Sequence, residues 1–361
     1  MRASAVTRKG ELLFVGLALP LLLGIAPPRG EPAPGAPLDF ADPFVLCDGG
    51  AYYAFATGTH GVHIQAARSR DHASWTLLAD ALPRLGSWAE DDPEFTWAPS
   101  VLPRGGRYVL YYTARHRASG YQCISRAVAD APAGPYVDDS AFPFVCDIDQ
   151  GGSASASERR CGSIDPSPFV DADGQAYLLW KSDENSPACH APPRLWSQRL
   201  TEDGMSTAGD RKMLLAMDQP WEAPIIEGPS MLRRAEGYYL FYSANWYDGA
   251  NYAIGYATCA GPSGPCTKVT TSGPLLKSDG AVLGPGGQEF FTDPEDRTWM
   301  AYHGWTAPHA AYASGGVRSL QIAPVTFEGG APKVGQGEAP RVQMAPRIET
   351  RDTSTAKSTD G

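Results

Sequence analysis

The sequence predicts an all-β protein built as a five-bladed β-propeller. Two observations point to this fold. First, the 361-residue chain is rich in turn residues, with 39 Gly and 32 Pro, and only 19% of its residues are charged. Such a composition suits short strands joined by many turns better than long amphipathic helices. Second, one sequence pattern recurs along the chain at the spacing of a propeller blade.

The recurring pattern is one residue, a proline, a short apolar segment, a turn with Gly or Asp, and an aromatic-rich strand. Four clear copies begin at Asp42-Pro43, Ala98-Pro99, Asp165-Pro166 and Gly228-Pro229, and a weaker fifth begins at Gly286. The copies start roughly sixty residues apart, close to the length of a four-stranded blade with long loops. Each copy is typical of a β-hairpin. A β-sandwich, the alternative fold, does not predict one motif repeating at this spacing.

The chain divides into four predicted segments. Residues 1–30 are predicted to be a signal peptide, because basic residues precede an apolar run that ends at Pro27 and Pro28. The alternative is a retained membrane anchor, but an apolar run of about fourteen residues is short for a bilayer span. Residues 31–38 form a Pro-rich lead-in, and 39–340 form the catalytic propeller. The polar tail, 341–361, is expected to be disordered.

The net charge limits the kinds of partner. It is −10 for the whole chain, and loss of residues 1–30 removes four basic residues and one acidic residue, which leaves −13. An acidic protein repels phosphate backbones and anionic lipid, so nucleic acid and membrane surfaces are excluded as expected partners. Neutral substrates remain open. We therefore expect a secreted, extracellular protein that acts as a monomer.

All seven cysteines follow the predicted signal peptide. An exported protein meets an oxidising compartment, where disulfides persist. We expect Cys259 to pair with Cys266, because a tight turn lies between them. Proximity in sequence suggests the pairs Cys123–Cys146 and Cys161–Cys189. Seven is odd, so one thiol stays free, and Cys47 is the candidate. The chain has no CxxC pair, and a zinc site is therefore not indicated.

Acidic residues recur at the start of the repeated motif. Inner strands of a propeller run in the same direction along the axis, so equivalent residues at their starts converge on one mouth of the central channel. Asp42 and Asp165 precede the repeated proline, Glu227 lies one position earlier in its copy, and Trp97 lies beside the second copy. A lone Asp before Pro usually caps a turn. Three acids at one repeat position instead indicate an active site at this mouth, because crowded carboxylates are costly.

Paired carboxyl groups, one protonated and one ionised, are the apparatus of glycoside hydrolysis. The motifs around the three acids resemble those of glycoside hydrolase family 43. The matching segments are Phe-Ala-Asp42-Pro-Phe, Ser-Ile-Asp165-Pro-Ser, Ile-Glu227-Gly-Pro-Ser, Trp97-Ala-Pro and Tyr-His303-Gly-Trp. The resemblance covers about residues 39–330 and implies a five-bladed propeller that cleaves arabinose- or xylose-containing plant polysaccharides with inversion.

The resemblance also implies roles for individual residues. Asp42 would be the general base, Glu227 the general acid, and Asp165 would orient the site and modulate the acidity of Glu227. His303 matches a histidine that holds a calcium ion, largely through water, in the channel of many members. Arg318 matches an arginine that contacts the sugar next to the cleaved bond.

Other positions bear on the substrate. The register of Trp97 places it at the mouth, where we expect it to bind sugar. Two residues depart from the family pattern: Ser100 stands where many members have an acid, and Gly287 stands where a histidine is common. The first leaves substrate preference open, and the second weakens the case for a metal.

A non-catalytic carbohydrate-binding propeller is the main alternative, but its blades would carry the same binding residues in every copy. Here the acids occupy three copies and are absent from two, which favours one asymmetric catalytic centre. A fructan-cleaving propeller lacks support because no Asn-Asp-Pro-Asn-like start is present. The choice among α-L-arabinofuranosidase, endo-arabinanase and β-xylosidase stays open.

Overall fold

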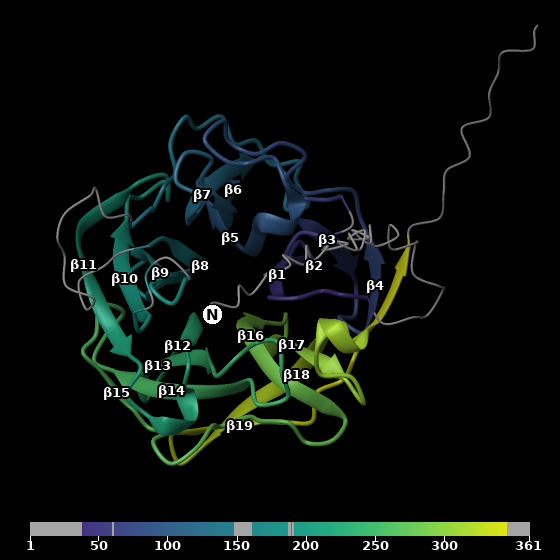
Figure 1. The fold of residues 1–361 in the computed structure, drawn as a ribbon, viewed down its shortest axis with the longest axis vertical. Coiled ribbons are helices and arrows are strands. Elements are labelled where there is room, and N and C mark those ends of the chain that lie inside the picture. The colour runs from purple at the N-terminus through teal and green to yellow at the C-terminus, as the bar shows by residue number, and fades with distance from the viewer. Residues whose placement is uncertain (1–37, 60, 148–160, 187–188, 190, 345–361) are drawn as a thin grey trace, which may run out of the picture. The chain divides into compact units, whose positions relative to one another are not determined.

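Five β-sheets are arranged around a central channel, as predicted (Figure 1). The structure is a computed structural model that describes residues 38–59, 61–147, 161–186, 189 and 191–344. Within these residues the helices are the short 3-10 helices η1 (Pro93–Phe95), η2 (Pro220–Glu222) and η3 (Tyr312–Ser314). None of the described helices has the length and apolar character needed to cross a membrane.

Each blade is a sheet of antiparallel strands, to which blade one adds one parallel strand, and its first strand lies nearest the axis (Figure 1). Blade one contains β1 (Phe44–Asp48), β2 (Ala51–Ala56), β3 (Gln65–Ser69) and β4 (Ser74–Leu77), with β20 (Arg341–Met344) added at its outer edge. Blade two contains β5 (Thr96–Arg104), β6 (Arg107–Arg115) and β7 (Gln122–Ala129).

Blades three to five each have four strands. Blade three contains β8 (Ser163–Val170), β9 (Ala176–Ser182), β10 (Arg194–Leu200) and β11 (Thr207–Ala216). Blade four contains β12 (Ile226–Arg234), β13 (Gly237–Ala244), β14 (Ala253–Cys259) and β15 (Cys266–Lys268). Blade five contains β16 (Val282–Thr292), β17 (Thr298–Thr306), β18 (Arg318–Glu328) and β19 (Ala331–Val334).

The last strand, β20, corrects the predicted domain boundary. Residues 341–344 were assigned to the polar tail, but β20 pairs in parallel with β4, with Arg341 opposite Ser74. The tail prediction depended on the absence of apolar periodicity. A strand at a sheet edge is held by backbone hydrogen bonds and needs no such pattern. The predicted signal peptide, residues 31–37 of the lead-in and residues 345–361 of the tail lie outside the described residues.

The hydrophobic core is divided into five clusters, and each lies between two neighbouring blades. The alternation of side chains along a strand explains this division. In β13, Leu240 and Tyr242 pack towards blade three, whereas Tyr239 and Phe241 pack towards blade five. The aromatic second strand of each motif is therefore apolar on both faces, as is usual for a strand covered on both sides.

The three predicted disulfides are present. They join Cys123 to Cys146, Cys161 to Cys189 and Cys259 to Cys266. The last pair links directly opposed residues of β14 and β15. Cys47 is the free cysteine, as expected.

The inter-blade core predicts the outcome of a truncation at Phe241, whose side chain is fully buried between blades four and five. Phe241→Ala should lower the free energy of unfolding by about 3–5 kcal/mol, because it removes buried apolar area and leaves a cavity. Phe142→Ala is the matched control, since Phe142 is 79% exposed, and it should change the free energy of unfolding by less than about 0.5 kcal/mol. Urea denaturation of the oxidised protein measures both. Equal effects would contradict the assignment of the core.

Candidate active site

The repeated motif places one residue with a left-handed backbone at the start of every blade. These residues are Asp42 (φ 51°), Ala98 (φ 45°), Asp165 (φ 56°), Gly228 (φ 55°) and Gly287 (φ 61°). In blades two to five they lie in a β-bulge of the inner strand, where the pairing with the second strand shifts register. A non-glycine residue in this conformation costs of order 1–3 kcal/mol and needs support from its surroundings. Glu227 immediately precedes the bulge residue of blade four, which explains its offset in the motif.

The support comes from a ring of hydrogen bonds that links the blades, here called the inter-blade ring. Each bulge residue donates its backbone N–H to a side chain of the preceding blade. The donor–acceptor pairs are Ala98 to Thr57 Oγ1 (3.1 Å), Asp165 to Thr113 Oγ1 (3.3 Å), Gly228 to Asp165 Oδ2 (2.9 Å), Gly287 to Ser243 Oγ (2.8 Å) and Asp42 to His303 Nδ1 (3.0 Å). The predicted acids Asp42 and Asp165 are both members of this ring, and the ring brings them to one mouth of the channel with Glu227.

Asp42 is surrounded by groups that favour its ionised form. The Thr57 hydroxyl donates to Asp42 Oδ2 at 2.6 Å, and Arg318 Nη1 lies 3.7 Å from Asp42 Oδ1. Burial alone would raise the pKa of Asp42, but the Arg318 guanidinium, then His303 and finally the Thr57 hydrogen bond outweigh it and hold this pKa well below its usual range. Arg318 in turn donates to the Tyr312 hydroxyl at 2.8 Å and lies over the Tyr247 ring. The sequence prediction that Arg318 belongs to the site is consistent with this placement.

Asp165 has the opposite electrostatic environment. Its pKa is raised, first because the carboxyl is buried and second because the negative charge of Glu227 disfavours another charge nearby. Lys181 and the Gly228 N–H offset part of this effect. Since two interacting carboxyls titrate as a pair, the pair binds a proton more readily than an isolated carboxyl would. Asp165 is thus a member of the pair whose pKa is raised by its surroundings.

Glu227 is held by two residues that the sequence did not reveal. Lys181 Nζ donates to Glu227 Oε2 at 3.1 Å, and the Tyr252 hydroxyl donates to Glu227 Oε1 at 2.8 Å. Lys181 follows an apolar run in β9, and Tyr252 begins a run, Tyr252 to Ala257, that is typical of an outer blade strand, so neither residue stands out in the sequence as part of a site. An ionisable residue within an otherwise apolar buried strand is the signal that could have found Lys181.

His303 is fully buried and closes the inter-blade ring. Because the Asp42 N–H points at His303 Nδ1, this nitrogen is the acceptor and the ring proton lies on Nε2. Burial lowers the pKa of His303, which favours this neutral form. Nε2 has no hydrogen-bond partner among the described residues. A protonated Nε2 does not bind a metal directly, so the residues present do not fit a calcium ion bound by His303 itself. A calcium ion held through water remains a proposal.

The two departures from the family pattern have structural explanations. Beside Ser100, the carboxyl of Glu289 from blade five accepts hydrogen bonds from the hydroxyls of Ser100, Ser167 and Ser230. Glu289 of blade five thus places a carboxyl beside Ser100, the position at which many family members have an acid. Burial is the main reason why the pKa of Glu289 is raised to about 7. Sequence reasoning missed Glu289 because the fifth motif copy is degenerate.

Gly287 is required at its position by close packing as well as by its backbone. A Cβ atom there would lie 2.6 Å from His303 Nδ1 and 2.9 Å from Asp42 Oδ1. A histidine at this position would therefore displace the contact between Asp42 and His303.

Trp97 lies at the same register position in blade two as Glu227 does in blade four. It pairs with Thr113 as Glu227 pairs with Ser243. Its indole N–H donates to the Glu94 carbonyl at 2.7 Å, which fixes the ring, and its side chain is only half-buried. This register is consistent with the predicted location of Trp97 at the mouth, and its contact with sugar stays a prediction.

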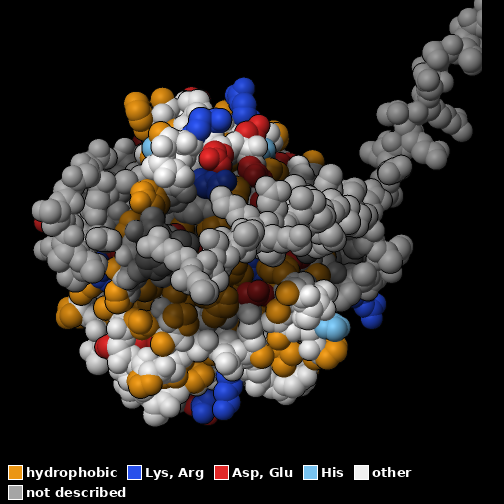
Figure 2. Space-filling view, viewed as in Figure 1, with side chains coloured by type: hydrophobic (Ala, Val, Ile, Leu, Met, Phe, Trp, Pro, Cys, Tyr) orange, Lys and Arg blue, Asp and Glu red, His pale blue; other side chains and the backbone are white. Residues whose placement is uncertain are grey.

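The described side chains on the face shown in Figure 2 carry interspersed charges of both signs, among apolar groups. No continuous basic stripe, the mark of a nucleic-acid-binding surface, is visible in the described part of this face.

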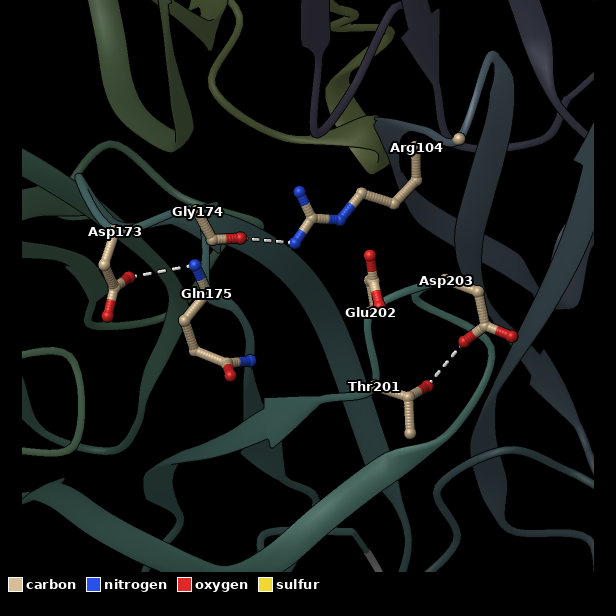
Figure 3. A pocket seen from close by; sticks show the side chains of 8 residues that line it. Arg104, Asp173, Gly174, Gln175, Thr201, Glu202 and Asp203 are labelled. Atoms are coloured by element: carbon tan, nitrogen blue, oxygen red, sulfur yellow. Dashed lines mark hydrogen bonds between the residues drawn. The ribbon is translucent and has the colours of Figure 1, made fainter.

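Figure 3 shows a polar cleft of about 970 Å³ whose lining residues include none of the three acids. It is lined by hairpin turns of blades two and three, including Arg104, Gly174 and Glu202. Arg104 donates to the Gly174 carbonyl across it (Figure 3). The inner strands begin at the acids and end at such turns, so this cleft lies at the opposite end of the channel. It has no aromatic lining residue and is not the candidate active site.

Five blades with three carboxyls at one mouth define a propeller of the glycosidase type. The sequence profile of glycosyl hydrolases family 43 matches residues 33–332, and the chain belongs to this family. It is therefore a glycosidase, and the family resemblance inferred from the motifs is confirmed.

Named relatives and solved structures agree with this membership. The arabinan endo-1,5-alpha-L-arabinosidase A of Aspergillus niger is 28% identical over 275 residues, which cover 70% of this chain and 78% of that protein. A thermostable family-43 glycoside hydrolase superposes with a TM-score of 0.71 and 27% identity, over 86% of this chain and 96% of the other. An endo-1,4-beta-xylanase from Bacteroides thetaiotaomicron gives 0.68 and 28%, over 85% and 98%.

The inter-blade ring predicts the effect of losing one hydroxyl. Thr57→Val keeps the shape of the side chain but removes the acceptor of the Ala98 N–H and the donor to Asp42. It should lower the free energy of unfolding by about 1–3 kcal/mol, the cost of leaving buried polar groups unpaired. Thr57→Ser keeps the hydroxyl and should cost clearly less. Thermal unfolding compares the two. A loss in Thr57→Ser as large as that in Thr57→Val, or larger, would contradict the role given to the hydroxyl.

Proposed function

We propose that this family 43 glycosidase is an inverting enzyme that cleaves arabinose- or xylose-containing plant cell-wall polysaccharides or oligosaccharides. Its action would be of the α-L-arabinofuranosidase, endo-arabinanase or β-xylosidase type. The observation that carries the proposal is the meeting of Asp42, Asp165 and Glu227 at one mouth in different electrostatic surroundings. The names of the arabinan-cleaving and xylan-cleaving relatives support the choice of sugar.

Asp42 is proposed as the general base. Its carboxylate stays ionised down to low pH because Arg318 and Thr57 favour the charge. An ionised carboxylate can accept a proton from a water molecule as that water attacks the anomeric carbon. Arg318, fixed by Tyr312, is proposed to contact the sugar beside the cleaved bond while it orients Asp42.

Glu227 is proposed as the general acid, which gives its proton to the glycosidic oxygen as the bond to the anomeric carbon breaks. Asp165, hydrogen-bonded to the N–H of the next residue, Gly228, would modulate its acidity through the repulsion between the two carboxyls. Asp42 lies in blade one and Glu227 in blade four. Inversion needs the two carboxyls about 6.5–9.5 Å apart to admit a water, a spacing that residues from different blades suit.

The mouth would bind neutral sugar rather than an anion. Trp97 is proposed to pack against a sugar ring, since indole rings present a large apolar surface. A non-catalytic sugar-binding propeller would need no such set of acids in unlike environments. Release of sugar from arabinan, arabinoxylan, xylan and their aryl glycosides distinguishes the two functions and separates the three activity types.

We also propose that the enzyme is exported and acts outside the cell, after removal of residues 1–30. The three disulfides support this, because such bonds persist in oxidising compartments. Mass spectrometry of the protein from culture medium would give the mature N-terminus, and a chain retained in the cytosol would contradict the proposal.

The two proposed catalytic roles predict different substrate dependence. Glu227→Gln should reduce cleavage of natural linkages by about 10²–10⁴-fold, the usual contribution of general acid catalysis. It should retain activity on an aryl glycoside whose leaving group needs no proton. Asp42→Ala should lose activity on both, since the water is no longer activated. Initial rates on the two substrate classes measure this.

The stereochemistry tests the same assignment independently. Proton NMR of the first product should show the inverted anomer, and a retained anomer would overturn the mechanism. Specific sugar binding with no hydrolysis of any substrate would instead favour the non-catalytic propeller.

A pH dependence follows from the surroundings of Asp42. Because the Thr57 hydroxyl stabilises the ionised carboxylate, Thr57→Val should raise the pKa of Asp42. The base must be ionised, so the acid limb of the pH profile of kcat/KM should move to higher pH. Thr57→Ser should leave the limb in place. A limb that is the same in all three proteins would mean that Asp42 does not control it.

A further inference from the structure

Blade three departs from the inter-blade ring at one position. Each bulge residue is preceded by a residue that pairs with the second strand of the same blade, or with the residue directly after that strand. The five pairing residues are Thr57, Thr113, Lys181, Ser243 and His303. Four of these five side chains accept the N–H of the next blade. Lysine has three donors and no acceptor, so it cannot do this. The N–H of Gly228 is accepted by Asp165 instead.

The lysine that interrupts the pattern is committed to two carboxylates. Only 1% of the Lys181 side chain is exposed, and its Nζ donates to Glu227 Oε2 and to Asp183 Oδ1, both at 3.1 Å. A buried ammonium is costly unless it is paired and hydrogen-bonded. The equivalent residue in the other four blades is not a lysine, so the fold does not need an ammonium group at this position. The charge of Lys181 therefore calls for an explanation other than the stability of the fold.

Several charged or titratable groups act on Glu227. Lys181 reaches it from β9, Asp165 acts from β8, and Tyr252 and Tyr247 approach from the segment between β13 and β14. Asp42 adds negative charge to the same mouth. Lys181 is the cation among them that contacts Glu227 directly, and Asp183 is its other counter-ion. The net effect of the lysine on Glu227 thus depends on how much of its charge Asp183 neutralises.

We propose that Lys181 and Asp183 are positioning residues that together set the acidity and the orientation of Glu227. This inference rests on the proposed role of Glu227 as the acid. When Glu227 gives its proton to the glycosidic oxygen, the C–O bond breaks, water attacks the anomeric carbon, and Asp42 takes the proton of that water. Lys181 stabilises the carboxylate that remains on Glu227. Asp183 limits this effect, so that Glu227 can still carry its proton beforehand.

The test is a pair of substitutions with opposite expected effects. Lys181→Met removes the positive charge, so Glu227 should hold its proton to higher pH, and the basic limb of kcat/KM should move up by about 1–3 pH units. Asp183→Asn leaves the lysine charge unopposed by Asp183, so the limb should move down. KM should stay near the wild-type value in both, because the buried lysine cannot touch the substrate.

Two further variants serve as controls. Lys181→Arg keeps the charge and should keep the limb near its original pH. Lys212→Met removes a lysine whose side chain is 55% exposed on β11, and it should leave the limb unmoved. If Lys181→Met does not fold, as judged by circular dichroism, then Lys181→Arg and Asp183→Asn decide the question.

A measurement that needs no activity separates this inference from the proposed function. ¹³C NMR of glutamate side-chain carboxyls, with Glu227→Gln to assign the signal, follows the titration of Glu227 directly. Its midpoint should rise in Lys181→Met and fall in Asp183→Asn. Midpoints that stay in place in both variants would overturn the inference whatever the enzyme cleaves. If the midpoints move as expected but the wild-type protein hydrolyses no substrate, the electrostatic coupling holds and the proposed catalytic role of Glu227 is refuted.

Discussion

This architecture depends on one hydrogen bond between each pair of neighbouring blades. In each of them, the N–H of a left-handed residue is donated to a side chain of the preceding blade. Five hydrophobic clusters hold neighbouring blades together, but apolar contacts do not fix where the strands begin along the axis. The inter-blade ring does so, because a hydrogen bond tolerates little displacement. The positions of the carboxyls at the mouth follow from it.

The same ring explains why function and strain coincide. Asp42 and Asp165 adopt a conformation that L-residues rarely take, and glycine or alanine occupies the equivalent places in the other blades. Their side chains face the channel as a result of that conformation. The backbone cost is offset by the ring, in which Asp165 acts both as donor and as acceptor. Asp165 and Glu227 lie in the inner strands of their blades, and Asp42 directly precedes the inner strand of blade one.

The parts of the site that could be predicted are those that repeat. Asp42, Asp165 and Glu227 stood out because other blades gave a register against which to compare them. Lys181 has counterparts in the second strands of other blades, but its neighbours Leu179 and Trp180 are core residues and hid it within an apolar strand. Its meaning depends on the contact with Glu227, which is 46 residues away. Strand β20 was missed for a different reason, since backbone pairing at an edge leaves no side-chain pattern.

The closure of the ring also has a consequence for the order in which the enzyme becomes competent during synthesis. Asp42 depends on His303, 261 residues later, for the acceptor of its N–H, and on Arg318 for its charge. A nascent chain that has not yet released blade five has an aspartate in blade one without either partner. Asp42, the proposed base, is among the first residues of the propeller to be made and among the last to gain its partners. If Asp42 has that role, a chain that ends before blade five lacks the surroundings that keep its carboxylate ionised.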